Sequence, residues 1–205
     1  MLDFAKIQAT PLETEPYPYL IVEDVLIGED LVALPTELPE VREGGAIPVA
    51  EVTGGPSFDR LVGELEGERF RKLLSDKFAI DLDGLEVATT YRGLMRWRDG
   101  VIHTDTPAKA ITVLLYLNTD SGPDQASLRI LRSGDDLEDF VAEVPPRLGT
   151  MVLFKVTENC WHGHKPMIGK RSSLQLNYLS GKEVKGHEKK RRARARLARL
   201  FGISR

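Results

Sequence analysis

In the middle of the sequence a histidine and an aspartate stand two residues apart, a pair that can bind a metal. They are His103 and Asp105, and the other histidines are His162, His164 and His187. On an extended segment, side chains at positions i and i+2 point to the same side, so the imidazole and the carboxylate can reach one ion. A third ligand from a distant strand would complete a facial set of two histidines and one carboxylate, which suits iron(II) that must also bind a co-substrate and dioxygen. Taken alone, the pair also fits an ordinary surface pair.

A second group of polar residues follows further along the chain. His162 precedes Pro166, Arg171 and Ser173 in a segment that continues into apolar residues. An arginine in an apolar strand needs an anionic partner, because burying its charge unpaired is costly. Its planar fork matches a carboxylate through two hydrogen bonds and stays charged at any working pH. Arg171 is therefore a candidate carboxylate-binding residue, and the alternative is a surface arginine at the start of a strand.

In their order and spacing, these motifs resemble the 2-oxoglutarate oxygenase core, and most closely its prolyl-hydroxylase-like branch. The resemblance runs from about residue 88 to residue 180. It implies that iron(II) is held by His103, Asp105 and His162. His164 competes for the third position, since positions 162 and 164 face the same side of an extended segment. The spacing to the following proline and arginine favours His162.

The same resemblance implies a site for 2-oxoglutarate. Arg171 would bind the far carboxylate of this co-substrate, and Ser173 would assist with its hydroxyl. Tyr116, in a Tyr-Leu-Asn sequence at the end of the preceding apolar run, would help to hold it. Tyr91 is a weaker candidate for the same pocket, and a tyrosine of the hydrophobic core is at least as good an interpretation.

The implied activity is that of an Fe(II)- and 2-oxoglutarate-dependent dioxygenase. Such an enzyme uses O2, couples oxidative decarboxylation of 2-oxoglutarate to succinate and CO2 with hydroxylation of a substrate, and can use ascorbate as a reductant. Asp105 favours hydroxylation or another oxidation over halogenation, because in related halogenases a small residue replaces this carboxylate and leaves room for a halide. The substrate, a small molecule or a protein side chain, stays open, since one fold supports many functions.

Patterns of apolar residues predict the elements that must position these side chains. Residues 57–78 repeat apolar side chains at steps of three and four, which predicts a helix. From residue 85 onward, short apolar or alternating runs predict strands at 113–117, 128–131, 151–154 and 173–179. Residues 17–22 are expected to be extended, and residues 35–55, rich in glycine and proline, predict loop around one short strand.

Several short strands with an external helix predict a mainly β sandwich or barrel. The resemblance narrows this to a double-stranded β-helix, the jelly-roll or cupin-like core, with flanking helices. We expect one structural domain, for which 205 residues suffice. Residues 1–84 would form N-terminal strands, loops and a support helix packed on the core, residues 85–180 the catalytic core, and residues 181–205 a basic helix or tail.

Charge is distributed unevenly along the chain. Residues 181–205 carry ten Lys/Arg and two Asp/Glu, a balance of +8, whereas the first 180 residues carry a balance of −11. The acidic body disfavours a phosphate backbone, and Asn177 stands where nucleic-acid demethylases commonly have a second arginine. The tail could still bind nucleic acid or an anionic membrane surface. The favoured interpretation is that it packs on the acidic body or is solvated.

The sequence also bears on the cellular setting. Cys160 is the only cysteine, so an intrachain disulfide is excluded. No apolar run approaches the roughly 20 residues needed to span a bilayer, and the first residues do not have the pattern of a secretory signal. We therefore expect a cytoplasmic protein, of open oligomeric state.

Two other functions stay open beside the oxygenase. One is a cupin-like metal enzyme that does not use 2-oxoglutarate, and the other is a binding module that works through its basic tail. Arg171 discriminates against the first, because such an enzyme has no reason to keep a carboxylate-binding fork at this position.

Overall fold

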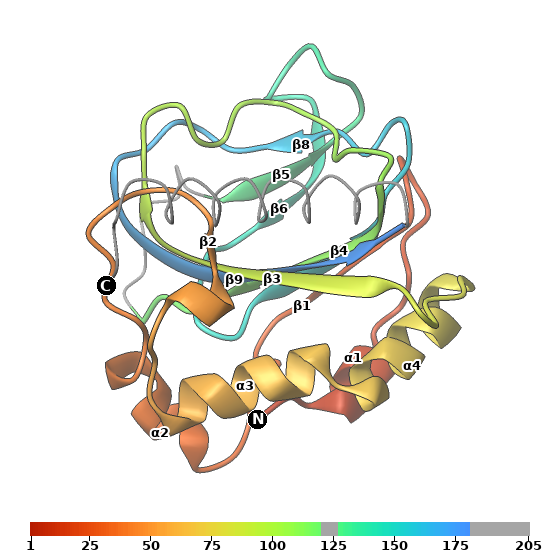
Figure 1. The fold of residues 1–205 in the computed structure, drawn as a ribbon. Coiled ribbons are helices and arrows are strands. Elements are labelled where there is room, and N and C mark those ends of the chain that lie inside the picture. The colour runs from red at the N-terminus through yellow and green to blue at the C-terminus, as the bar shows by residue number, and fades with distance from the viewer. Residues whose placement is uncertain (120–126, 181–205) are drawn as a thin grey trace, which may run out of the picture.

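The core consists of two antiparallel sheets, one above the other in Figure 1. The computed structural model describes residues 1–119 and 127–180, so the predicted basic tail lies outside the described residues. The larger sheet has the order β1-β7-β4-β9-β3-β2, and these strands are Tyr19–Val22, Met151–Lys155, Lys109–Tyr116, Gly169–Leu179, Glu86–Met95 and Ile47–Pro48. The smaller sheet has the order β6-β5-β8, which is Phe140–Val144, Leu128–Leu131 and His162–Gly163. This is the mainly β, double-stranded β-helix core that was predicted.

Helices cover the outer face of the larger sheet (Figure 1). They are α1, α2, α3 and α4, at Phe4–Ala9, Asp30–Ala33, Pro56–Glu66 and Glu68–Phe78, and short 3-10 turns occupy Leu34–Thr36 and Val49–Glu51. The single helix predicted at 57–78 is therefore wrong in one respect, because Gly67 separates α3 from α4. That residue has an extended backbone (φ −73°, ψ 155°), and glycine gives up more conformational freedom in a helix than any other residue.

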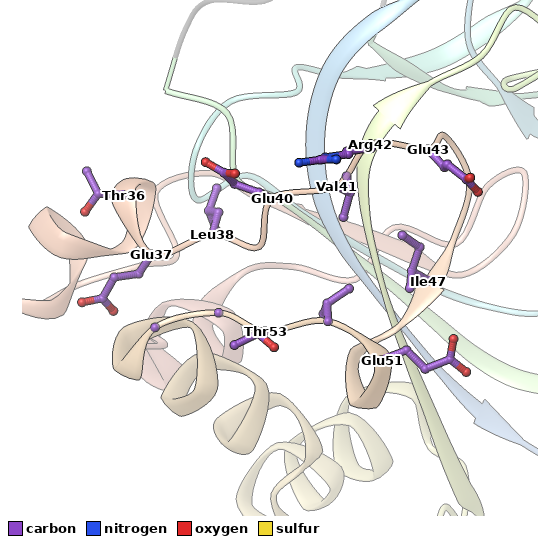
Figure 2. Close-up of a pocket in the computed structure, with 13 residues that line it drawn as sticks. Thr36, Glu37, Leu38, Glu40, Val41, Arg42, Glu43, Ile47, Glu51 and Thr53 are labelled. Carbon is purple, nitrogen blue, oxygen red and sulfur yellow. The ribbon is translucent and has the colours of Figure 1, made fainter. Parts of the chain in front are cut away.

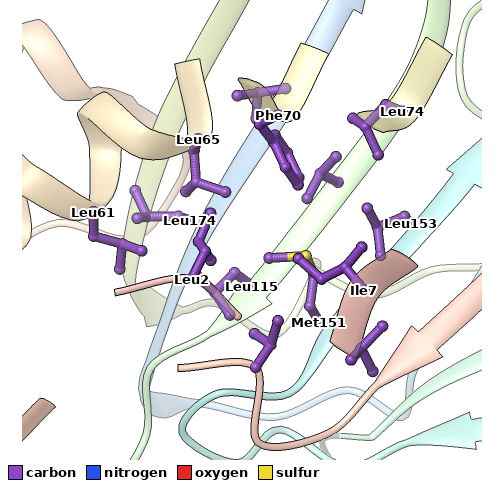
Figure 3. Close-up of a cluster of buried hydrophobic side chains, with 14 of the residues drawn as sticks. Leu2, Ile7, Leu61, Leu65, Phe70, Leu74, Leu115, Met151, Leu153 and Leu174 are labelled. Carbon is purple, nitrogen blue, oxygen red and sulfur yellow. The ribbon is translucent and has the colours of Figure 1, made fainter. Parts of the chain in front are cut away.

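Successive side chains of the central strands point to opposite faces of the larger sheet. One face packs in the hydrophobic core, and the other is the inner face of the sheet. Leu115 of β4 and Leu174 of β9 are register partners, and both belong to the main core cluster with Met151, Phe70 and Leu74 (Figure 3). Their neighbours along the strands point the other way, towards the smaller sheet. That inner face carries Thr112, Leu114, Tyr116, Arg171, Ser173 and Gln175.

The predicted strands at 113–117, 128–131, 151–154 and 173–179 are confirmed as β4, β5, β7 and β9, and both β4 and β9 begin earlier than predicted. The extended segment at 17–22 contains β1, and the loop at 35–55 contains β2 as its one strand. Within the described ranges, no helix combines the length and the apolar character needed to cross a bilayer.

Candidate active site

Two histidines and an aspartate meet where β8 adjoins the connection between β3 and β4. His162 begins β8, whereas His103 and Asp105 lie in the connection. One possible ligand atom from each residue lies within 4.8 Å of the others. The backbones of His103 and His162 are joined by two hydrogen bonds of 3.0 Å, one in each direction. The fold therefore brings together the three residues that the sequence motifs selected.

His103 and Asp105 do not lie on a regular strand. His103 makes only an isolated bridge to His162, and Asp105 belongs to no strand. The reason is that the chain must turn before β4, which it does with a hydrogen bond from Lys109 N to Thr106 O of 3.0 Å. The side chains of positions 103 and 105 nevertheless reach one place, as the i and i+2 spacing requires.

Both imidazoles are oriented by backbone carbonyls. His103 Nδ1 lies 2.8 Å from Val101 O, and His162 Nδ1 lies 2.7 Å from Cys160 O. When Nδ1 donates this hydrogen bond, Nε2 of each ring is left to bind a metal. Burial, together with the neighbouring His103, lowers the pKa of His162 to about 4. His162 is therefore neutral near pH 7, which is the form that binds metals.

Asp105 is held by two side chains that sequence reasoning missed. Lys109 Nζ donates to one carboxylate oxygen at 2.7 Å, and Thr112 Oγ1 donates to the other at 2.5 Å. Thr112 Oγ1 also lies 3.0 Å from Asn177 Oδ1. Burial by itself would raise the pKa of Asp105, but Lys109 and Thr112 outweigh it and lower the pKa. The carboxylate is thus kept ionised and oriented as a ligand.

Replacing Thr112 with valine should weaken Mn(II) binding by about 10- to 100-fold, the usual cost of losing a group that orients a ligand. The change keeps the shape of the side chain and removes only the hydroxyl that holds Asp105. Calorimetric titration with Mn(II) measures the effect. Thr89→Val is the matched control, because the Thr89 hydroxyl is buried and has no hydrogen-bond partner. Equal weakening in both variants would contradict this role of Thr112.

Arg171 is buried, and none of the described residues is an anionic partner for it. Its residue is only 5% exposed, Nη2 donates to Tyr116 Oη at 2.7 Å, and Nη1 lies 3.9 Å from Met95 Sδ. Nε has no hydrogen-bond partner. Within the described residues no carboxylate forms an ion pair with this guanidinium. A buried and unpaired cation is costly, so the geometry calls for an anion from outside the chain.

One cavity of about 300 Å³ between the two sheets connects this arginine with the metal ligands. His103 and His162 line it at the smaller sheet, and Arg171, Tyr116 and Ser173 line it at the larger one. Ser173 alternates with buried core residues along β9 and faces inward with Arg171. Two of the three metal-binding candidates and three of the four co-substrate candidates therefore line the same space, and the third metal-binding candidate, Asp105, lies next to the two histidines.

His164 lines this cavity but lies outside the metal cluster. Its Nδ1 is 2.8 Å from Lys165 O, and burial and the charge of Arg171 lower its pKa to about 4. The ring packs on the backbone of Gly100, where an added Cβ would come within 2.2 Å of a ring carbon. Gly100 also has φ +94°, so this position favours glycine for two reasons.

Tyr91 does not line this cavity, so its assignment as a co-substrate residue stays a prediction without support from the cavity lining. Its ring packs edge-on against Phe58 at a centroid distance of 5.7 Å, and its hydroxyl lies 3.2 Å from Ser172 Oγ. It pairs in register with Leu174, which belongs to the main core cluster. Tyr91 therefore faces the helices, because its position in β3 has the opposite side-chain direction to that of Arg92.

A larger hollow, of about 690 Å³, lies apart from these residues (Figure 2). It is lined by loop residues of 36–55, including Glu37, Glu40, Arg42 and Glu51. Glu37 accepts a hydrogen bond from Ser57 N at 2.6 Å and so supports the start of α3. Among the described residues, the histidine–aspartate group of the inner cavity is the one cluster suited to a metal.

Comparisons with known proteins agree with this geometry. Residues 92–179 match the model of the 2OG-Fe(II) oxygenase superfamily. A prolyl-4-hydroxylase from Pseudomonas putida is 18% identical with a TM-score of 0.57, over 86% of this chain and 98% of that one. A Trichoplax adhaerens prolyl hydroxylase, solved with a hypoxia-inducible-factor peptide fragment, is 16% identical with a TM-score of 0.53, over 88% and 90%. HygX from Streptomyces hygroscopicus, solved with iron, is 15% identical with a TM-score of 0.53, over 80% and 82%. No curated protein sequence matches the chain.

The residues present fit the metal that the superfamily uses. Two imidazoles and one ionised carboxylate supply three ligands and leave further coordination positions for other groups. The matched segment contains all three ligands and the unpaired arginine of the same cavity. Residues 92–179, somewhat under half of the chain, are therefore similar to the 2OG-Fe(II) oxygenase superfamily, and the side chains of this site fit an Fe(II)- and 2-oxoglutarate-dependent dioxygenase.

Proposed function

We propose that the protein hydroxylates a C–H bond of a small molecule or a protein side chain, with 2-oxoglutarate held by Arg171, Tyr116 and Ser173. The observation that supports this most is the buried, unpaired guanidinium of Arg171 in the cavity that also contains the metal ligands. A carboxylate is the anion that its fork matches best. A cupin-like enzyme without this co-substrate would leave the cost of burying that charge uncompensated.

The chain's own side chains have distinct parts in this function. His103, Asp105 and His162 would hold the iron, which would supply the activation of dioxygen needed to oxidise 2-oxoglutarate and the substrate. Arg171 and Tyr116 fix one end of the co-substrate, and His103, Asp105 and His162 fix the metal at the other. Leu114, Leu128 and Phe154 line the cavity with apolar surface and exclude water from the reacting groups.

Relatives bear on the class of substrate. The Trichoplax adhaerens relative was solved with a peptide fragment, and HygX was solved with iron bound. We infer that a protein side chain and a small molecule are both suitable classes.

Release of succinate tests the proposed function. Protein supplied with Fe(II), ascorbate, 2-oxoglutarate and O2 should form succinate slowly, and faster when a substrate from a panel of small molecules and peptides is added. Formation must stop when Fe(II) is removed by a chelator. A protein that binds Mn(II) at one site but neither binds nor consumes 2-oxoglutarate would support the cupin-like alternative.

A further inference from the structure

A second arginine projects into the same cavity. Arg92 of β3 is the register partner of Ser173 on β9, and its side chain lines the cavity with Arg171 and His162. The β3–β9 ladder is irregular at this point, since Gly93 alone stands opposite two residues of β9. Bulges of this kind re-aim side chains beside functional sites. Met95 also lines the cavity, although a regular strand would not place positions 92 and 95 on one face.

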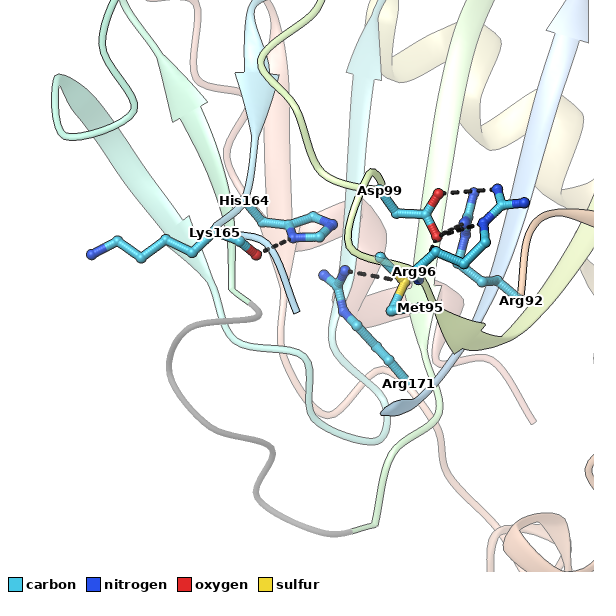
Figure 4. Close-up of polar contacts among 7 residues, drawn as sticks. All are labelled: Arg92, Met95, Arg96, Asp99, His164, Lys165 and Arg171. Carbon is cyan, nitrogen blue, oxygen red and sulfur yellow. Dashed lines mark hydrogen bonds and ion pairs between the residues drawn. The ribbon is translucent and has the colours of Figure 1, made fainter. Parts of the chain in front are cut away.

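Arg92 shares its one acidic partner with another arginine (Figure 4). Its Nη1 lies 3.1 Å from Asp99 Oδ2. Asp99 also binds Arg96, through Nη2 at 3.1 Å and through the backbone N at 2.8 Å. Although Arg92 Nη1 is close enough to Asp99 for an ion pair, it is buried and makes no hydrogen bond of good geometry. One carboxylate therefore pairs with two guanidiniums, and Arg92 retains N–H groups that can donate to another acceptor.

The cavity keeps an excess of positive charge after the co-substrate is counted. Its lining includes Arg92, Arg98 and Arg171 but only one acidic side chain, that of Asp99. The two carboxylates of 2-oxoglutarate are assigned to Arg171 and the metal, and Asp105 is already paired with Lys109. Burial lowers the pKa of Arg92, and although Asp99 opposes this, the charges of Arg96 and Arg171 add to it. The surroundings of Arg92 thus contain more positive than negative charge, since Asp99 is shared with Arg96.

We propose that Arg92, held in place by Asp99, binds an anionic oxygen group of the substrate, a carboxylate or a phosphate. This rests on the proposed function and narrows its substrate class to molecules or side chains that carry such a group close to the oxidised carbon. Arg92 is partly exposed, with 26% of its side chain accessible, whereas Arg171 is 5% exposed. The deeper arginine suits a co-substrate that binds first, and the more accessible one suits a substrate that enters later.

The test uses small anions on the Mn(II)- and 2-oxoglutarate-loaded protein, which does not turn over. Mn(II) broadens the proton signals of molecules that bind close to it, so acetate and methyl phosphate serve as the probes. We expect saturable broadening of at least one probe in the wild type, and the probe that binds more tightly assigns the group as carboxylate or phosphate. In Arg92→Met the probe affinity should fall by roughly 10- to 100-fold, since a hydrogen bond to a charged group is lost.

Control variants separate this role from a structural one. Arg60→Met removes an arginine that is also paired with a single aspartate, Asp30, but lies on the helix side, and it should bind the probe like the wild type. Arg92→Lys keeps the charge without the planar fork and should restore part of the affinity for the probe. If Arg92→Met does not fold, Arg92→Lys still tests the proposal.

Four results would overturn the proposal: no saturable broadening in the wild type, equal probe affinity in Arg92→Met, displacement of the probe by additional 2-oxoglutarate, or loss of 2-oxoglutarate binding in a folded Arg92 variant. The last two would assign Arg92 to the co-substrate. If the wild type binds neither Mn(II) nor 2-oxoglutarate, the proposed function itself fails, and that is seen before any probe is added.

Discussion

Replacing Arg171 with alanine should weaken 2-oxoglutarate binding by about 2–5 kcal/mol, the usual cost of truncating one partner of a buried charge pair. That loss corresponds to roughly a 30- to 5,000-fold increase in Kd. The reason is that the guanidinium is buried, donates to Tyr116 Oη, and has no carboxylate partner among the described residues. Calorimetric titration of the Mn(II)-loaded protein with 2-oxoglutarate measures the effect.

The same experiment contains its own controls. Arg171→Lys should recover only part of the affinity, because lysine offers a point charge in place of a planar fork. Mn(II) binding should change little in both variants, since Arg171 is not a metal ligand, and Arg60→Ala on the helix side should leave both ligands unaffected. Equal 2-oxoglutarate affinity in the wild type and Arg171→Ala would contradict the co-substrate assignment and favour the cupin-like alternative.

Replacing His162 with alanine should abolish one-site Mn(II) binding under conditions where the wild type saturates. The effect should exceed the roughly 10- to 100-fold loss that follows removal of a supporting group, because a ligand itself is removed and two ligands remain. His164→Ala is the matched control, since its ring lies in the same cavity but outside the metal cluster. Retained binding in His162→Ala with loss in His164→Ala would show that the wrong histidine had been assigned.

Much of the site could be predicted because its polar residues stand out within apolar or alternating segments of the sequence. The alternation at 173–179 requires no knowledge of the fold, and it correctly predicted β9, whose inner face carries Ser173 and Arg171. The histidine and aspartate of 103 and 105 were recognised from spacing alone, and their closeness to His162 is confirmed. Patterns of this kind can be recognised in the sequence because they depend only on neighbours along the chain.

The direction of the β3 side chains could not be predicted. Alternation shows that Tyr91 and Arg92 face opposite ways, but which of them faces the cavity depends on pairing with β9, about 80 residues away in the sequence. The irregularity at Gly93 is likewise a property of the pair of strands. The sequence interpretation therefore considered Tyr91 for the pocket and gave no role to Arg92, whereas the structure places Arg92 in the cavity.

The support of Asp105 was missed for a similar reason. Lys109 and Thr112 follow it closely in the sequence, but their contact with its carboxylate depends on the turn that starts β4. A charged residue four positions away is common on any surface, so spacing alone carries no signal here. The break between α3 and α4 could have been expected, since Gly67 interrupts the helical pattern and lies at the junction.

The paired backbone hydrogen bonds between His103 and His162 have a consequence for how the metal arrives. These bonds do not involve the imidazole rings, and they join the two ligand-bearing segments at the backbone, with ring centroids 4.3 Å apart. Pairing of the segments therefore belongs to the folding of the chain, and much of the conformational entropy of ordering the site is lost with it. We expect metal exchange to leave this backbone pairing in place.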